Sequence, residues 1–229
     1  MSSAENFEIV LADTSIEIYR ALEERILMSS EDWMALGRVS AFHASVFDFP
    51  GEGTALVSPA NSFGFMDGGI DALYLELLGE DLEDRVRDVL AADYHGELLV
   101  GQATIVDTEH PDSFPFLIVA PTMRVPAVLP EDTINPYLAL RAALRAAAAD
   151  PRVKRVVLPG LGTGVGLVDA DRFALQAHAA LQEFFEGACF PGSWWEAAVA
   201  HQALYGQSPR DLQYETGDHL PRGFSDSEA

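Results

Sequence analysis

Residues 58–71, SPANSFGFMDGGID, place one asparagine, three glycines and two aspartates between a short apolar run and a helix-like pattern. Glycine lets a ligand approach the main chain closely, and backbone N–H groups exposed in this way bind phosphate. Asparagine and aspartate hydrogen-bond to sugar hydroxyls or to water, and an aspartate can act as a general base. The stretch, called the first loop below, therefore predicts a cradle for a phosphate-linked nucleotide, with Asn61 and Asp71 directed at its sugar.

A second glycine-rich stretch, PGLGTGVG at residues 159–166, follows the apolar run VKRVVL and is called the second loop. It has neither the GxGxxG spacing of a dinucleotide fold nor the GxxxxGK[ST] pattern of a P-loop. Lys154 is the only lysine in the chain. One such loop can be a simple tight turn, but two that end apolar strands would suit a diphosphate held from both sides.

Hydrophobic periodicity predicts strands and helices in alternation. Strands are predicted within residues 6–13, 37–49, 54–60, 98–108, 114–122 and 153–160. Helices are predicted within residues 14–27, 70–78, 82–94, 136–149, 169–187 and 193–206, with Asp169 as an N-cap. Alternation of this kind predicts an α/β protein, a three-layer α/β/α sandwich with a mixed, largely parallel sheet.

The candidate site follows from this architecture, because ligands bind at the carboxyl ends of the strands in such sheets. The first loop, the second loop and residues 121–126 (PTMRVP) all lie at predicted strand ends. We therefore expect these three segments to come together.

Composition excludes several classes of protein. The 229 residues carry 36 acidic and 14 basic side chains, a net charge of −22, which disfavours general nucleic-acid binding. No apolar run is long enough for a membrane span, and no secretory signal is visible, so a cytoplasmic protein is expected. The single Cys189 and the scattered histidines give no metal-ligand spacing, so neither a metal nor a cofactor is expected.

The two loops carry a family resemblance. ALVSPANSFGFMDGGID resembles the signature of macro domains, in which a strand leads to an N-A-A-N-S stretch, a glycine-rich segment and an aspartate at the start of a helix. VVLPGLGTGVG resembles the second loop of the same family. The resemblance covers most of the chain between Gly37 and Gly187. It implies an α/β/α sandwich that binds ADP-ribose, and some members hydrolyse ADP-ribose from proteins or from small acetylated derivatives.

The resemblance also implies roles for individual residues. Asn61 would hydrogen-bond the distal ribose, and Asp71 matches the acidic position that orients or deprotonates the attacking water in hydrolytic members. The remaining ligand-binding candidates are Ser58, Gly68, Gly69, Ile70, Arg124, Gly162, Thr163, Gly164, Val165 and Gly166.

Several positions depart from the family pattern. Ser58 replaces the first asparagine, and Gly166 replaces an aromatic residue that many hydrolases place near the ribose. Ser45 stands where the family has an adenine-reading aspartate, which leaves Asp48 or a backbone amide for that task. From the residues alone, Asn61 could also bridge its own loop, and Asp71 could be only a favourable residue in the first turn of a helix.

The sequence thus predicts one macro-domain-like domain over residues 1–206, with an extra strand and helix at about 7–36 added as a further layer, and a flexible acidic tail over residues 207–229. The expected partner is ADP-ribose or an ADP-ribosylated substrate, with no membrane and no general nucleic acid. Three functions stay open: hydrolysis of ADP-ribose from a carboxylate ester, non-catalytic reading of ADP-ribose, and a site for another phosphorylated nucleoside.

Overall fold

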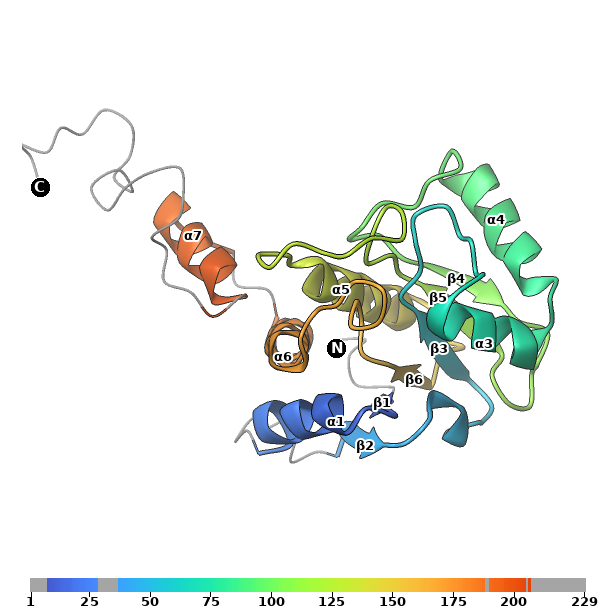
Figure 1. The fold of residues 1–229 in the computed structure, drawn as a ribbon, viewed down its shortest axis with the longest axis horizontal. Helices are drawn as coiled ribbons and strands as arrows, with labels where there is room; N and C mark the ends of the chain where they lie inside the picture. The colour runs from blue at the N-terminus through green and yellow to red at the C-terminus, as the bar shows by residue number, and fades with distance from the viewer. Residues whose placement is uncertain (1–7, 29–36, 188–189, 205, 207–229) are drawn as a thin grey trace, which may run out of the picture.

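The computed structural model describes residues 8–28, 37–187, 190–204 and 206. The predicted tail over residues 207–229 therefore lies outside the described part (Figure 1). The strands are β1 (Glu8–Asp13), β2 (Val39–His43), β3 (Thr54–Ser58), β4 (Thr104–Asp107), β5 (Phe116–Val119) and β6 (Arg155–Leu158). The helices are α1 (Ile16–Leu22), α3 (Gly69–Leu78), α4 (Leu82–Asp93), α5 (Asn135–Ala149), α6 (Ala170–Glu186) and α7 (Trp194–Ala203). None of the described helices is long and apolar enough to cross a membrane.

The strands form one six-stranded sheet in the order β2-β1-β6-β3-β5-β4. Every neighbouring pair is parallel except β4 and β5, which are antiparallel. A chain that alternates strands and helices gives parallel pairs because each helix returns the chain to the starting edge of the sheet. The prediction of a mixed, largely parallel sheet is confirmed.

Helices cover both faces of this sheet. Alternate side chains of a strand point to opposite faces: Ile9 and Leu11 of β1 belong to a core formed with α1, α5 and α6. Val10 and Ala12 belong to a second core formed with α3 and α4. The three-layer α/β/α arrangement follows from this division. In Figure 1, the orange-red α7 lies beyond α6, at the far end of the molecule from α3 and α4.

The position of β1 corrects one expectation. We expected the N-terminal strand and helix to form an extra layer, but β1 lies inside the sheet, between β2 and β6. The four residues from Ile9 to Ala12 are all buried, and both edges of the strand are paired. An apolar strand of this kind is stable only with both faces and both edges covered. The carboxyl end of β1 therefore joins the edge of the sheet where the site was expected.

The strands β2 and β4 fall furthest short of their predicted ranges. The strand predicted within residues 37–49 ends at His43, because Ser45 and Asp48 form a capping box that turns residues 46–48 into a 3₁₀ helix. The strand predicted within residues 98–108 begins only at Thr104. Before it, Gly101 adopts a φ of +92° and the Gln102 N–H donates to the Leu99 carbonyl, which closes a turn instead.

Candidate functional site

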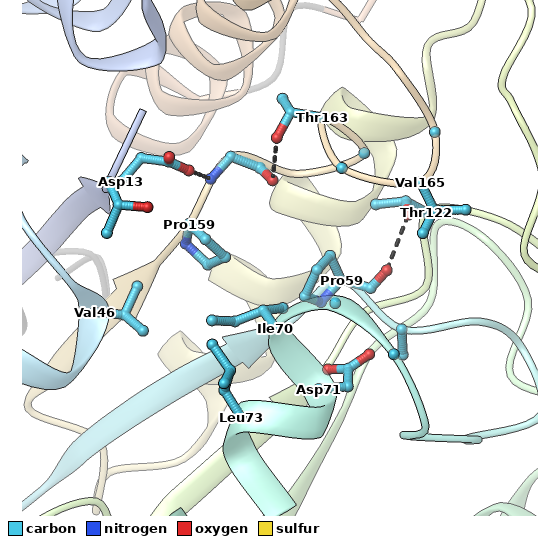
Figure 2. Close-up of a pocket in the computed structure, with 18 of the residues that line it drawn as sticks. Asp13, Val46, Pro59, Ile70, Asp71, Leu73, Thr122, Pro159, Thr163 and Val165 are labelled. Atoms are coloured by element: carbon cyan, nitrogen blue, oxygen red, sulfur yellow. Dashed lines mark hydrogen bonds between the residues drawn. The ribbon is translucent and has the colours of Figure 1, made fainter. Parts of the chain in front are cut away.

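A cavity with a volume of about 580 Å³ lies at the carboxyl ends of the parallel strands. Its walls come from the end of β1, from residues that directly follow β2, β3 and β6, from both glycine-rich loops and from the first turn of α3 (Figure 2). The carboxyl edge of a parallel sheet is where α/β proteins bind their ligands. Residues 121–126 contribute Thr122, Met123 and Pro126 to the same walls, as predicted.

Asn61 holds the first loop in shape. Its Oδ1 accepts hydrogen bonds from the N–H groups of Phe63 and Phe65, at 3.1 and 3.3 Å, and its Nδ2 donates to the Phe65 carbonyl at 2.8 Å. The side chain is buried and lines the cavity. The loop-bridging role that the sequence left open is therefore present. Within the described residues, Nδ2 uses one of its two N–H groups in this way, which leaves the second available at the cavity wall.

Gly68 and Gly69 leave the start of α3 open to the cavity. Gly68 occupies the N-cap position and offers no side-chain cap, so the N–H groups of the first turn are left for another acceptor. Gly69 has a φ of +58°, and a Cβ atom added to either glycine would meet nothing within 4 Å. The predicted amide cradle is thus exposed, and the dipole of α3 adds positive potential there.

Asp71 follows in the first turn of α3 and is the buried acid of the site. Ser58, at the end of β3, donates a 2.6 Å hydrogen bond to Asp71 Oδ1. Burial raises the pKa of Asp71 from 3.8 to about 7, and the Ser58 hydrogen bond opposes this rise because it favours the ionised carboxylate. Ser58 itself is fully buried and does not line the cavity, so it acts on Asp71 rather than on a ligand.

The second loop faces the first across the cavity. A Cβ at Gly166 would lie 2.5 Å from the Gly162 carbonyl oxygen, so this close turn requires glycine at residue 166. Gly162 has a φ of +72°, and the Thr163 hydroxyl donates to the Gly160 carbonyl at 3.0 Å. Gly164 and Val165 form the crest, where Val165 is half exposed (Figure 2). The aromatic residue that the family pattern has at residue 166 would not fit this turn.

None of the described residues that line the cavity has a basic side chain, while Asp13, Asp67 and Asp71 supply carboxylates. An anionic ligand would therefore be held by backbone amides.

Arg124, which we expected as a charged contact, is outside the cavity lining. Its guanidinium donates to both carboxylate oxygens of Glu97, at 2.6 and 3.2 Å, and lies over the ring of Phe63. In this arrangement Arg124 is paired with Glu97 outside the cavity wall, and a contact between Arg124 and a ligand stays a prediction.

Sequence reasoning missed the contribution of β1. Asp13, Thr14, Ser15 and Ile18 line the cavity, although none was a candidate. The available signal was a polar residue directly after an apolar strand, the same signal that marked the first loop. This signal points to the site only when β1 lies inside the main sheet, as it does here. Among the described residues, no group of three or more histidine, cysteine or acidic side chains is placed to hold a metal ion.

The fold and the site define an α/β/α protein with a cleft between two glycine-rich loops at the carboxyl edge of its sheet. The model of the macro domain family matches residues 57–177, and the chain belongs to this family.

An uncharacterised protein of Aquifex aeolicus (strain VF5) is 35% identical over 136 residues, which cover 58% of this chain and 75% of that protein. The Oceanobacillus iheyensis macrodomain with MES bound matches with a TM-score of 0.50 at 18% identity, over 67% of this chain and 85% of that one. A mutant of the O. iheyensis macrodomain with ADPR matches with a TM-score of 0.46 at 20% identity, over 56% and 70% of the two chains.

Proposed function

We propose that this protein binds ADP-ribose or a close derivative in the cavity between its two glycine-rich loops. The observation that carries the proposal is that residues of both glycine-rich loops line one cavity, and that none of the described residues in its walls is cationic. A diphosphate fits between such loops, because fixed N–H groups bind phosphate oxygens without a counter-ion. Membership of the macro domain family favours ADP-ribose over other diphosphates.

The layout of the sheet supports an elongated ligand. In strand order, β6 lies between β1 and β3, so the second loop lies between Asp13 and the Ser58–Asp71 pair. A diphosphate on Gly68, Gly69 and Gly164 would then place one sugar beside Asn61 and Asp71 and direct the remainder of the ligand towards β1. The free N–H of Asn61 Nδ2 would donate to a hydroxyl of the distal ribose.

A second candidate function is hydrolysis of ADP-ribose from a carboxylate ester, and the environment of Asp71 favours it. A general base works best when its pKa lies near the operating pH, and burial brings the pKa of Asp71 to about 7. Water would attack C1″ of the distal ribose while Asp71 takes a proton from that water. The bond between C1″ and the ester oxygen breaks, and the carboxylate leaves with the bonding electron pair.

Titration calorimetry tests the binding proposal. ADP-ribose should bind at least several-fold tighter than ATP, because the site has amides for a diphosphate and no P-loop lysine for a third phosphate. Tighter binding of ATP would contradict the proposal and favour a site for another nucleotide.

Incubation with a protein carrying ADP-ribose on an aspartate or glutamate then separates the enzyme from a reader. Release of ADP-ribose supports hydrolysis. Binding without any release would establish the non-catalytic reader.

A further inference from the structure

Asp13 presents a second carboxylate at the end of the cavity remote from Asp71. The register of β1 against β6 pairs Leu11 with Leu158, which brings Asp13 level with Gly160 at the start of the second loop. Figure 2 shows Asp13 and Val46 on one side of the cavity and Asp71 on the other. Two strand spacings separate β1 from β3, about 10 Å in all, so the two carboxylates cannot act on the same ligand atom.

Two backbone hydrogen bonds fix the orientation of the Asp13 carboxylate. Oδ1 accepts from the Ser15 N–H at 2.8 Å, and Oδ2 accepts from the Gly160 N–H at 2.9 Å. Each carboxylate oxygen can accept two hydrogen bonds, so each retains one acceptor site. Asp13 lines the cavity and is partly exposed. The Asp13 carboxylate is therefore already oriented, so hydrogen bonding to a ligand would cost it little side-chain entropy.

The walls around this carboxylate are apolar. They are formed by Ala12, Ile18, Val46, Phe47 and Pro159, of which the first three are almost fully buried. A cleft with apolar walls and one oriented polar group suits a flat heterocycle, whose faces pack on the walls while its edge is read by hydrogen bonding.

Two other polar side chains near this end form local hydrogen bonds. The Ser45 hydroxyl accepts from the Phe47 N–H, and the Asp48 carboxylate accepts from the Ser45 N–H. Asp48, which the sequence left as a reader of the base, is exposed and is not among the residues that line the cavity. Among the described residues at this end, Asp13 alone brings a carboxylate to the cavity.

We infer that the Asp13 carboxylate selects the base of the nucleotide by accepting a hydrogen bond from an exocyclic amino group, so that adenine is preferred to a purine with an exocyclic oxygen. This inference rests on the proposed binding of ADP-ribose. The acceptor comes from β1 and not from the end of β2, where Ser45 stands. An exocyclic oxygen and the carboxylate are both hydrogen-bond acceptors. Placed opposite each other at an apolar site, neither would have a donor.

The first experiment compares three ligands on the unaltered protein by titration calorimetry. They are ADP-ribose, its hypoxanthine analogue, and a purine analogue with hydrogen in place of the amino group. ADP-ribose should bind about ten- to a hundredfold tighter than either analogue, as expected for the loss of a hydrogen bond to a charged group. Equal binding of all three would overturn the inference and leave the proposed function intact. Absence of ADP-ribose binding would overturn both.

Variants then assign the preference to Asp13. In Asp13→Asn, the amide nitrogen can donate to an exocyclic oxygen, so the ratio of the affinities for ADP-ribose and the hypoxanthine analogue should fall to about one. The ratio is informative because displacement of the second loop would weaken both ligands alike. Ser45→Ala, at the same end of the cavity, should keep the original ratio. An unchanged ratio in Asp13→Asn would show that Asp13 only positions Gly160.

Discussion

The Ser58 hydroxyl donates a 2.6 Å hydrogen bond to Asp71 Oδ1, joining the carboxyl end of β3 to the first turn of α3. Both side chains are buried, and Asp71 still reaches the cavity. Burial raises the pKa of Asp71 to about 7, while this hydrogen bond keeps the carboxylate oriented and limits the rise. Near neutral pH, Asp71 is thus protonated in part of the molecules and ionised in the rest. The ionised form can act as a general base, which works best when its pKa lies near the operating pH.

Asp71→Asn should abolish release of ADP-ribose from an ester while changing its affinity little. The amide keeps the shape of the side chain and still accepts from Ser58, but it cannot take a proton from water. A base of this type contributes about 10²–10⁴-fold to a rate. Single-turnover release and calorimetry on the same variant separate the two effects.

The matched control is Asp67→Asn, which changes an exposed carboxylate in the same loop and should leave the rate almost unchanged. Undiminished release by Asp71→Asn would show that another group activates the water.

Ser58→Ala should move the pH dependence of release towards alkaline pH. The Ser58 hydrogen bond favours the ionised carboxylate, so without it the pKa of Asp71 rises above about 7. Release should be slower at pH 7 and recover at higher pH. Rate profiles of the two proteins measure the displacement, and an unaltered midpoint would contradict the coupling.

Asp71 should also make the folded protein less stable as the pH rises from about 4 to 7. Its pKa is raised in the folded state, so between these values the folded chain binds more protons than the unfolded chain. The free energy of unfolding therefore falls across this window by up to about 4 kcal/mol and then levels off. Asp71→Asn removes this term, so it should stabilise the protein more at pH 8 than at pH 5. Urea unfolding of both proteins at the two pH values gives the difference, and parallel curves would contradict it.

The sequence predicted the first loop well because its geometry is local. The spacing from Asn61 to Asp71 lies within one strand-loop-helix unit, and glycines at residues 68 and 69 mark where the main chain opens. The same holds for α6, where Asp169 is the predicted N-cap and accepts from the Arg172 N–H at 2.9 Å. Such features depend on hydrogen bonds between residues that are close in sequence.

The parts that the sequence did not predict depend on distant partners. Asp13 reaches the site only because β1 pairs with β6, and its contact with Gly160 spans 147 positions of the chain. Arg124 is paired with Glu97, in a loop 27 positions away. Strand order and side-chain pairing across loops leave no periodic pattern in a sequence, so neither was accessible from spacing alone.

Substitutions at two glycines of the second loop test its role as a phosphate cradle. Gly164→Val should leave the melting temperature almost unchanged, because a Cβ there meets nothing within 4 Å and the residue has no positive φ. Its side chain would occupy the space above the loop amides, so ADP-ribose should bind at least about tenfold more weakly, with Gly164→Ala in between.

Gly166→Ala is the opposite case, because its Cβ would lie 2.5 Å from the Gly162 carbonyl oxygen and the backbone must move. A loss of about 1–3 kcal/mol in the free energy of unfolding is expected for such overpacking. Calorimetry should thus show the loss of ADP-ribose affinity in Gly164→Val, and thermal unfolding should show the loss of stability in Gly166→Ala. Full ADP-ribose binding by Gly164→Val would show that the ligand does not contact the crest of the second loop.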